Sequence, residues 1–436
     1  MSSSHDDWIA RDAAVVWHGF TQMATYADNH PLIVDRAEGH ELVGVDGRRY
    51  LDAISSVWVT TLGHHHPDLD AAVREQLDLV AHTTMLGNGN RAVIELAEAL
   101  APVVPVDDPH FLFASDGAAA VEQALKIAFQ YWVNIGVSGR TRYLAFGGAY
   151  HGDTIGSLSV GAGGFGTDLY DPLRFSVLRA PGFDDPRCFE TAVAQVAEHA
   201  SELAAVVVEP MVQGAAGILL GDPAGLRALG DACAEHDVLL ICDEVATGFG
   251  RTGTLFASEQ CGLRPDLLCI AKGITGGYLP MSATVANPRV YDAFLGADLG
   301  ERTFYHGHSY GGNALAAAVA RRHLEILLKD DVLANVVDRS EQLGERLHAR
   351  FDTHPAVREV RVCGLMAGVE LAPPAPDLRW GRRITAATVA RGVLVRPIGD
   401  VMIMVPPLTI TAAEIDRIVD ALGAALDEVT ADASPS

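Results

Sequence analysis

Short segments made almost entirely of apolar residues recur through the middle of the chain. Helix-length segments such as AAVEQALKIAFQYW separate several of them. Strands that are apolar on both faces are typical of a parallel sheet covered by helices on both sides. The pattern therefore predicts an α/β domain with a mainly parallel seven-stranded sheet. Its strands are FLFA, RYLAF, FSVL, AAVVVEP, VLLICDE, LLCIAKG and SATVA, which begin at Phe111, Arg142, Phe175, Ala204, Val238, Leu267 and Ser282.

The two ends of the chain carry a different pattern of short strand signals and long helical ones. A helical pattern near 312–350 precedes REVRVCGLMAGVEL, a second helical stretch, VLVRP, VMIMVPP and a final helix. The segment ELVGVDGRRYLD, near the start, resembles this C-terminal part more than the middle. We expect residues 1–75 and 326–436 to form one smaller α+β domain beside a large domain of residues 76–325.

Composition and charge narrow the classes of function. The 436 residues are 49% hydrophobic and carry a formal net charge of −24. No run of five or more lysines or arginines is present to neutralise a phosphate backbone, so we expect no nucleic-acid partner. No apolar segment approaches the roughly 20 residues of a membrane span, and the acidic start does not match a signal peptide. We expect a cytoplasmic protein without a membrane partner.

Neither the cysteines nor the histidines indicate a metal site. The six cysteines are widely spaced and form no C-x-x-C motif, which also argues against a disulfide framework. The run GHHHP at 63–67 places its histidines on an extended or turning chain, where consecutive side chains point in different directions. We therefore expect no bound metal.

One lysine stands out as a candidate nucleophile. The chain has three lysines, of which Lys126 lies in a helical pattern and Lys329 at a helix end, where each can reach solvent. Lys272 instead follows the apolar run LLCIA and precedes GITGG. Burial at the carboxyl end of a strand lowers the pKa of an amine and makes it nucleophilic. The alternative is a structural lysine that reaches solvent from the strand end.

Acidic residues end two other predicted strands. Glu209 closes AAVVVEP, and Asp243 with Glu244 closes VLLICDE. The carboxyl ends of parallel strands form the edge where α/β sheets bind ligands. A carboxylate beside a pyridine nitrogen keeps that nitrogen protonated, which makes a pyridoxal ring an electron sink, so Asp243 is a candidate for this role. A solvated turn is one alternative; a magnesium strand of an NTPase is excluded, because the chain has no G-x-x-x-x-G-K-[ST] loop.

A phosphate site is predicted where FLFASDGAAAVEQALK passes from strand to helix. Free N–H groups at the start of a helix bind anions. The backbone amides of Gly117 and Ala118 are the candidates, while Asp116 suits a helix N-cap. A further strand ends in YHGDT, where Tyr150 is placed to stack on a flat ring or, alternatively, to fill the core.

Several motifs together resemble the class III pyridoxal-phosphate aminotransferases over nearly the whole chain. They are EPMVQGAAG, CDEVATGFGRTG, PDLLCIAKGITGG and FYHGHSYGGN. Within this class, the chain is similar to the diaminopelargonate aminotransferases of biotin synthesis in WHGFTQM, ISSVWV, AFQYW, YHGDT and VRPIGDVMIMVPP. The resemblance implies a fold-type-I homodimer that binds pyridoxal 5′-phosphate and transfers an amino group to 7-keto-8-aminopelargonate. It also implies active sites shared between the two subunits.

The resemblance assigns roles to single residues. Lys272 matches the Schiff-base lysine, Asp243 the partner of the pyridine nitrogen, Tyr150 the stacking aromatic, and Gly117 with Ala118 the phosphate turn. Gly307, His308 and Ser309 match a loop that reaches substrate and phosphate from the neighbouring subunit. Arg396 matches the arginine for the substrate carboxylate, and Arg251 is a second motif arginine, for which packing is an equal explanation. The other substrate-side positions implied are Phe20, Val57, Trp58 and Asp153.

Departures from the family pattern concern the amino donor. Many members that use S-adenosylmethionine have tyrosine in place of Phe20, a tryptophan pair in place of Val57-Trp58, and serine or threonine in place of Ala118. The loss of a hydroxyl and an indole changes what the donor pocket can hydrogen-bond. A subgroup that uses lysine is more similar at Phe20, Ser56-Val57-Trp58, Gly307-His308-Ser309 and the GGYLP that follows Lys272. The predicted donor is therefore S-adenosylmethionine or lysine.

Two alternative functions stay open at this point. The first is another class III aminotransferase that acts on a different ω-amine or diamine. The second is a homologue that binds pyridoxal phosphate without turnover, against which the intact set of lysine, acid and arginine argues. The transfer of an amino group to 7-keto-8-aminopelargonate remains the main prediction, and its expected mechanism is ping-pong transamination in which Lys272 moves the proton.

Overall fold

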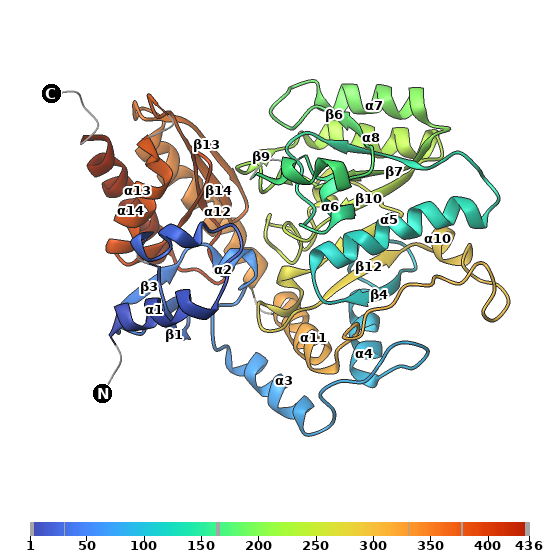
Figure 1. The fold of residues 1–436 in the computed structure, drawn as a ribbon, viewed down its shortest axis with the longest axis horizontal. Coiled ribbons are helices and arrows are strands. Elements are labelled where there is room, and N and C mark those ends of the chain that lie inside the picture. The colour runs from blue at the N-terminus through green and yellow to red at the C-terminus, as the bar shows by residue number, and fades with distance from the viewer. Residues whose placement is uncertain (1–3, 30, 163–165, 330, 376–377, 432–436) are drawn as a thin grey trace.

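The computed structural model describes residues 4–29, 31–162, 166–329, 331–375 and 378–431. Its chain forms two lobes that lie side by side, and the first and last described residues both lie on the smaller one (Figure 1). Among the described residues, no helix combines the length and the apolar character that a bilayer span requires. The larger lobe holds the sheet that positions the site.

A seven-stranded sheet forms the centre of the larger lobe. Its order is β4-β12-β11-β10-β7-β5-β6, and only β12 runs against the others. The prediction of a mainly parallel seven-stranded sheet is therefore confirmed. The strands are β4 (His110–Ala114), β5 (Arg142–Phe146), β6 (Leu178–Ala180), β7 (Leu203–Val208), β10 (Leu239–Asp243), β11 (Leu267–Ile270) and β12 (Ser282–Ala286).

One predicted strand is displaced along the chain. FSVL was expected to pair from Phe175, but β6 begins only at Leu178. The reason is local: the backbone N–H of Phe175 donates to the Ser159 hydroxyl at 3.1 Å and so does not join the sheet ladder. The apolar pattern alone does not reveal this competing side-chain acceptor.

Helices cover both faces of the large sheet, which explains why its strands are mostly apolar on both faces. Alternate residues of β7 and β10 pack against α5 on one face and against α7 and α8 on the other. Side chains of a strand point alternately to opposite faces, so both sets must be apolar here. These helices are α5 (Gly117–Asn134), α7 (Cys188–His199) and α8 (Pro223–Glu235), with the shorter α6 (Ile155–Val160), α9 (Ser258–Cys261) and α10 (Pro288–Asp292).

The smaller lobe joins the two ends of the chain. β3 pairs in parallel with β15, which extends the sheet β1-β2-β3-β15, and a second sheet has the order β13-β14-β17-β16. Its elements are β1 (Val34–Glu38), β2 (Glu41–Gly44), β3 (Arg49–Asp52), β13 (Val357–Cys363), β14 (Met366–Leu371), β15 (Val393–Leu394), β16 (Arg396–Ile398) and β17 (Val401–Met404), with helices α1 (His5–Val15), α2 (Ser55–Trp58), α12 (Val332–Phe351), α13 (Trp380–Ala390) and α14 (Ala412–Ala431).

Three further helices lie near the boundaries that the sequence suggested. α3 (Pro67–Leu77) and α4 (Arg91–Leu100) pack against α11 (Ala314–Lys329). The helical pattern near 312–350 is thus divided between α11 and α12, not one continuous helix. The proposed limits at 75 and 325 fall within α3 and α11, and the exact division into domains stays a prediction.

Candidate active site

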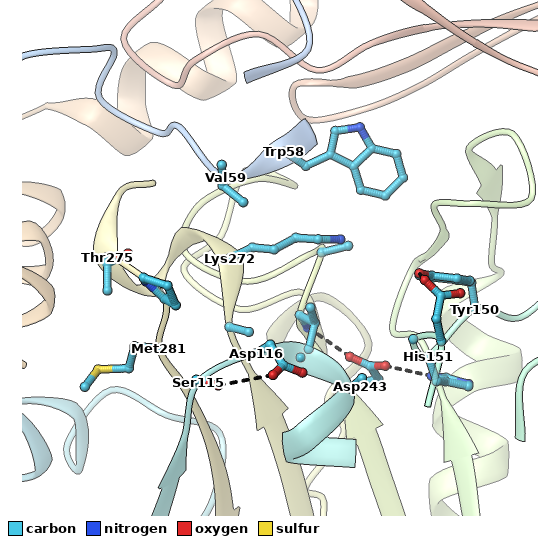
Figure 2. Close-up of a pocket in the computed structure, with 18 of the residues that line it drawn as sticks. Trp58, Val59, Ser115, Asp116, Tyr150, His151, Asp243, Lys272, Thr275 and Met281 are labelled. Atoms are coloured by element: carbon cyan, nitrogen blue, oxygen red, sulfur yellow. Dashed lines mark hydrogen bonds and ion pairs between the residues drawn. The ribbon is translucent and has the colours of Figure 1, made fainter. Parts of the chain in front are cut away.

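A cavity of about 690 Å³ opens at the carboxyl ends of β7, β10 and β11. Figure 2 shows Lys272 and Trp58 above Asp243, with Tyr150 and His151 to one side. The carboxyl edge of an α/β sheet is the usual ligand site. The described residues that line the cavity are Trp58, Val59, Ser115, Asp116, Gly117, Ala118, Tyr150, His151, Gly152, Asp153, Thr154, Glu209, Ala215, Asp243, Val245, Ala246, Ala271, Lys272, Thr275, Gly277, Tyr278, Leu279, Pro280 and Met281.

Lys272 follows β11 after one residue, Ala271, and points into the cavity (Figure 2). Its backbone φ is +44°, a left-handed conformation that turns the chain sharply out of the strand. Desolvation lowers the pKa of its amine, while the charges of Asp243 and Glu209 partly oppose the shift. The Nζ atom lies 4.6 Å from the centroid of the Trp58 ring. The amine is therefore more readily deprotonated than a solvated lysine, as a nucleophile requires.

Asp243 is the last residue of β10 and is only 4% exposed. Its Oδ2 accepts a hydrogen bond from His151 Nδ1 at 2.7 Å, and its Oδ1 accepts one from the N–H of Val245 at 3.0 Å. Burial alone would lower the pKa of His151, but the hydrogen bond and charge of Asp243 outweigh burial and raise it. The pair keeps a carboxylate in place at the floor of the cavity.

His151 was named in the sequence only as part of a strand end, and no role was assigned to it. The structure makes it the direct partner of Asp243. The motif YHGDT gave one usable signal, because residues that end or follow parallel strands of one sheet lie at the same edge, even when another strand separates them, as β7 separates β5 from β10 here. The pairing itself depends on the strand order, which the sequence does not state.

Glu209 adds a second buried acid beside this pair. Its two carboxylate oxygens accept the N–H of Tyr150 at 3.1 Å and the N–H of Gly214 at 3.2 Å. Burial raises the pKa of Glu209 to about 7, with the charge of Asp243 adding to the rise and that of His151 opposing it. This carboxyl group titrates near neutral pH, which is common among groups in catalytic sites.

The amino end of α5 borders the cavity with free backbone N–H groups. Asp116 is the N-cap, and its Oδ1 accepts the N–H of Ala119 at 2.9 Å, so the carboxylate is engaged in capping. The amides of the first helical residues, Gly117 and Ala118, have no partner within the helix. A Cβ on Gly117 would lie 2.7 Å from Val245 Cγ1, and one on Gly152 would lie 2.5 Å from Ala118 Cβ. The cradle admits an anion to the backbone, and it fits a phosphate group.

Tyr150 and Asp153 form one wall of the cavity. The hydroxyl of Tyr150 donates to Asp153 Oδ2 at 2.9 Å. Burial and this hydrogen bond raise the pKa of Tyr150, so the phenol stays neutral near physiological pH. The ring thus faces the cavity in one fixed orientation, as a group that contacts a flat ligand would need.

The other substrate-side positions do not all meet in this cavity. Trp58 lines it, whereas Val57 and Phe20 are 46% and 60% exposed and are not among its lining residues. Arg251 is buried and is not among the lining residues; its guanidinium donates to the Pro406 carbonyl, and burial lowers its pKa to about 9. Arg396 begins β16 and is exposed, outside the lining.

The loop at 307–309 lies at the rim of the cavity within the same chain. A hydrogen bond of 2.8 Å joins His308 Nε2 to the hydroxyl of Ser115, which lines the cavity. The carbonyl of Ser309 accepts His82 Nε2 at 2.8 Å, and Gly307 faces Leu86. A contribution of this loop to a neighbouring subunit stays a prediction.

Comparison with known proteins places the chain in a family. The model of the family described as aminotransferase class-III matches residues 22–426. An adenosylmethionine-8-amino-7-oxononanoate aminotransferase from Nitratidesulfovibrio vulgaris is 46% identical over 96% of this chain and 81% of its own. The crystal structure of an enzyme with the same name from Methanocaldococcus jannaschii has a TM-score of 0.94 and 36% identity, with 98% and 99% of the two chains covered.

A second solved structure is similar but differently named. It is an amine transaminase from an uncultivated Pseudomonas species in its PLP-bound form, with a TM-score of 0.89 and 35% identity, which covers 95% of this chain and 99% of its own. The structural neighbours support fold type I for the sheet and lobes described above. This chain belongs to the class III aminotransferases.

Proposed function

We propose that this protein transfers an amino group to 8-amino-7-oxononanoate, giving 7,8-diaminononanoate, with pyridoxal phosphate bound in the cavity at the sheet edge. The relatives from Nitratidesulfovibrio vulgaris and Methanocaldococcus jannaschii that carry the name of this reaction support the choice of acceptor. The observation that carries the proposal is the placement of a desolvated amine, Lys272, opposite the buried Asp243 and His151 in one cavity.

The residues that would hold the cofactor fit its three chemical parts. The free amides of Gly117 and Ala118 suit the phosphate, with His308 and Ser309 as further candidates. Asp243 suits the protonated ring nitrogen and Tyr150 a face of the ring. When bound, pyridoxal phosphate draws away the negative charge that develops at the Cα of an amine substrate.

Lys272 is the proposed site of covalent attachment and of proton transfer. Its lowered pKa leaves a larger fraction of the amine neutral, so Nζ can accept a proton from the donor's Cα and later return one to the acceptor. His151 holds Asp243 in one orientation through Nδ1, which keeps the carboxylate aimed from the cavity floor. Tyr150 and Trp58 form the walls that limit water around the amine.

Substrate selection is assigned to residues nearer the rim. Arg396 is exposed, and among the described residues no carboxylate lies within ion-pair distance of it, so its guanidinium can receive a substrate carboxylate. Phe20, Val57 and Gly307 are proposed to shape the part of the site that binds the amino donor. Asp153 is proposed as a polar contact for the substrate, and Arg251 as a second arginine near the site. The proposed donor is S-adenosylmethionine or lysine, and the proposed assembly is a homodimer with shared sites.

A donor screen tests this function. Purified protein loaded with pyridoxal phosphate is mixed with S-adenosylmethionine, lysine or a buffer blank, and the absorbance of the bound cofactor is followed. The proposal expects one of the two amines to shift the spectrum and 8-amino-7-oxononanoate to restore it. A spectrum that neither amine shifts, or that the keto acid does not restore, would contradict the proposal.

A second candidate is an amine transaminase for other ω-amines or diamines. The structural similarity to the Pseudomonas amine transaminase, at 35% identity, favours it specifically. The same screen separates the two, because a simple ω-amine with a keto acid other than 8-amino-7-oxononanoate would then give the faster turnover. Cofactor binding without any amine exchange would instead indicate a homologue that does not turn over.

A further inference from the structure

Four consecutive residues that are not glycine adopt left-handed backbone conformations beside the cavity. Ser55, Ser56, Val57 and Trp58 have φ values of +47°, +46°, +67° and +69°. The N–H of Val59 donates to the Ser55 carbonyl at 2.9 Å, which closes the turn. The segment α2 is thus one turn of left-handed helix. L-residues other than glycine, asparagine and aspartate rarely adopt this conformation, and a β-branched residue such as Val57 does so least.

A buried carboxylate holds this strained turn in place. Asp52 is fully buried; its Oδ1 accepts the N–H of Ser56 at 3.0 Å and its Oδ2 accepts the Ser56 hydroxyl at 2.8 Å. His64 Nε2 also contacts Oδ2, at 3.0 Å. On the other side, the hydroxyl of Ser55 donates to the Val405 carbonyl at 2.7 Å. Strained backbone conformations persist only where several contacts with the surrounding structure hold them, as these four contacts do.

The turn delivers one side chain to the reactive amine. Trp58 ends it, and its indole lies over Lys272, with 4.6 Å between Nζ and the ring centroid (Figure 2). The far edge of the ring rests on Gly214, where an added Cβ would lie only 2.8 Å from Trp58 Cζ3. The ring is therefore fixed from above by the turn and from the side by the backbone that also binds Glu209.

We propose that Asp52 is a positioning residue, which holds the left-handed turn Ser55–Trp58 so that the Trp58 indole covers Lys272 and limits how an amine approaches it. This inference rests on the proposed function, since the approaching amine is the amino donor. The strained turn ends at Trp58, so its conformation sets where the ring lies relative to Lys272. Asp52 lies outside the cavity lining and acts only through the turn.

A double-mutant cycle tests whether Asp52 acts through Trp58. Asp52→Asn weakens the contacts at Oδ2, and the rate of the donor half-reaction in cofactor-saturated protein should fall about tenfold, as for the loss of one charged hydrogen bond. In a Trp58→Ala background the same change should alter the rate by less than about twofold. An equal tenfold loss in both backgrounds would overturn the inference. A wild-type protein that reacts with no amine would instead count against the proposed function.

Relief of strain gives a second arm. Glycine tolerates positive φ, so the double variant Asp52→Asn/Val57→Gly should react at least about threefold faster than Asp52→Asn alone. Leu299→Gly is the matched control, because Leu299 has φ +53° and is 77% exposed but lies outside the cavity lining; it should restore nothing. Equal effects of both glycines, or no rescue by Val57→Gly, would contradict a role for the turn.

A readout that needs neither cofactor nor activity completes the test. The near-ultraviolet circular dichroism of the cofactor-free chain is measured with and without Trp58→Phe, and the difference isolates the Trp58 signal. Asp52→Asn should reduce this difference spectrum and Val57→Gly should restore it. An unchanged Trp58 spectrum in Asp52→Asn would overturn the inference. If Asp52→Asn does not fold, Ser56→Ala, which removes only the 2.8 Å bond to Oδ2, replaces it in each arm, with a loss of about threefold expected.

Discussion

The start of α5 offers a quantitative test of the phosphate cradle through Gly117→Ala. Gly117 has no left-handed φ, and alanine is the best helix former, so the substitution has no backbone penalty at this position. The added Cβ would lie 2.7 Å from Val245 Cγ1 and 3.1 Å from Cγ2, where ordinary contacts lie between 3.4 and 4 Å. Either the helix start or Val245 must therefore move.

The cost follows from this overlap. Overpacking of a close contact typically costs about 1–3 kcal/mol, which corresponds to roughly 5- to 150-fold in a Kd. Val245 lines the cavity, and its N–H donates to Asp243 Oδ1, so movement there disturbs the ring partner as well as the phosphate turn. We expect Gly117→Ala to weaken the binding of pyridoxal phosphate within this range.

The assay is a titration of cofactor-free protein with pyridoxal phosphate, followed by absorbance. Gly344→Ala in α12 is the control, because no heavy atom lies within 4 Å of its added Cβ, and it should leave the Kd unchanged. Val245→Ala removes the two clashing methyl groups, so adding it to Gly117→Ala should recover most of the affinity. A wild-type Kd in Gly117→Ala, or a loss that Val245→Ala does not relieve, would refute the placement of the phosphate at this turn.

Three further predictions concern the walls and floor of the cavity. Arg396→Ala should raise the KM for 8-amino-7-oxononanoate about tenfold with little change in kcat, because a carboxylate loses its cation; steady-state kinetics with an unchanged KM would refute this role. Tyr150→Phe removes the 2.9 Å bond to Asp153 and should lower kcat/KM about fivefold, which an unaltered kcat/KM would exclude. The pKa of His151 is raised despite burial, because the hydrogen bond and charge of Asp243 outweigh desolvation. The protonated His151 therefore stabilises the fold fully below about pH 6.5, and this stabilisation is lost as the pH rises through the higher pKa of the folded state. The free energy of unfolding of His151→Phe, measured with urea, should lack this pH dependence. If the pH dependence persists in this variant, another group causes it.

The elements of the large sheet could be predicted because burial on both faces leaves a direct mark on the sequence. Most positions of these strands are apolar, and the pattern indicates a strand whatever its neighbours are. The direction of β12 has no such mark, since the small residues of SATVA could be buried in a parallel or an antiparallel strand alike. The displacement of β6 has no such mark either, because it depends on the hydroxyl of Ser159 in α6, which competes for the N–H of Phe175.

The residues of the candidate site likewise fall into those that the sequence could predict and those that it could not. Lys272, Asp243 and Glu209 could be predicted from the sequence, since each comes at the end of an apolar run and such ends converge on one edge of the sheet. The partnership of His151 with Asp243 depends on strand order, and the left-handed turn before Trp58 depends on Asp52 and Val405, contacts that no local pattern encodes. Family resemblance directed attention to Phe20 and Arg396, which lie outside the cavity lining within one chain.

The formation of 7,8-diaminononanoate from 8-amino-7-oxononanoate tests the central role of Lys272 most directly. Wild-type protein and Lys272→Ala, both supplied with pyridoxal phosphate, are incubated with the keto acid and either S-adenosylmethionine or lysine, and the diamine is quantified. We expect product from the wild type with at least one donor and a rate about 10³-fold lower for Lys272→Ala, because the amine that moves the proton is gone. Similar rates for the two proteins, or no diamine from the wild type with either donor, would contradict this assignment.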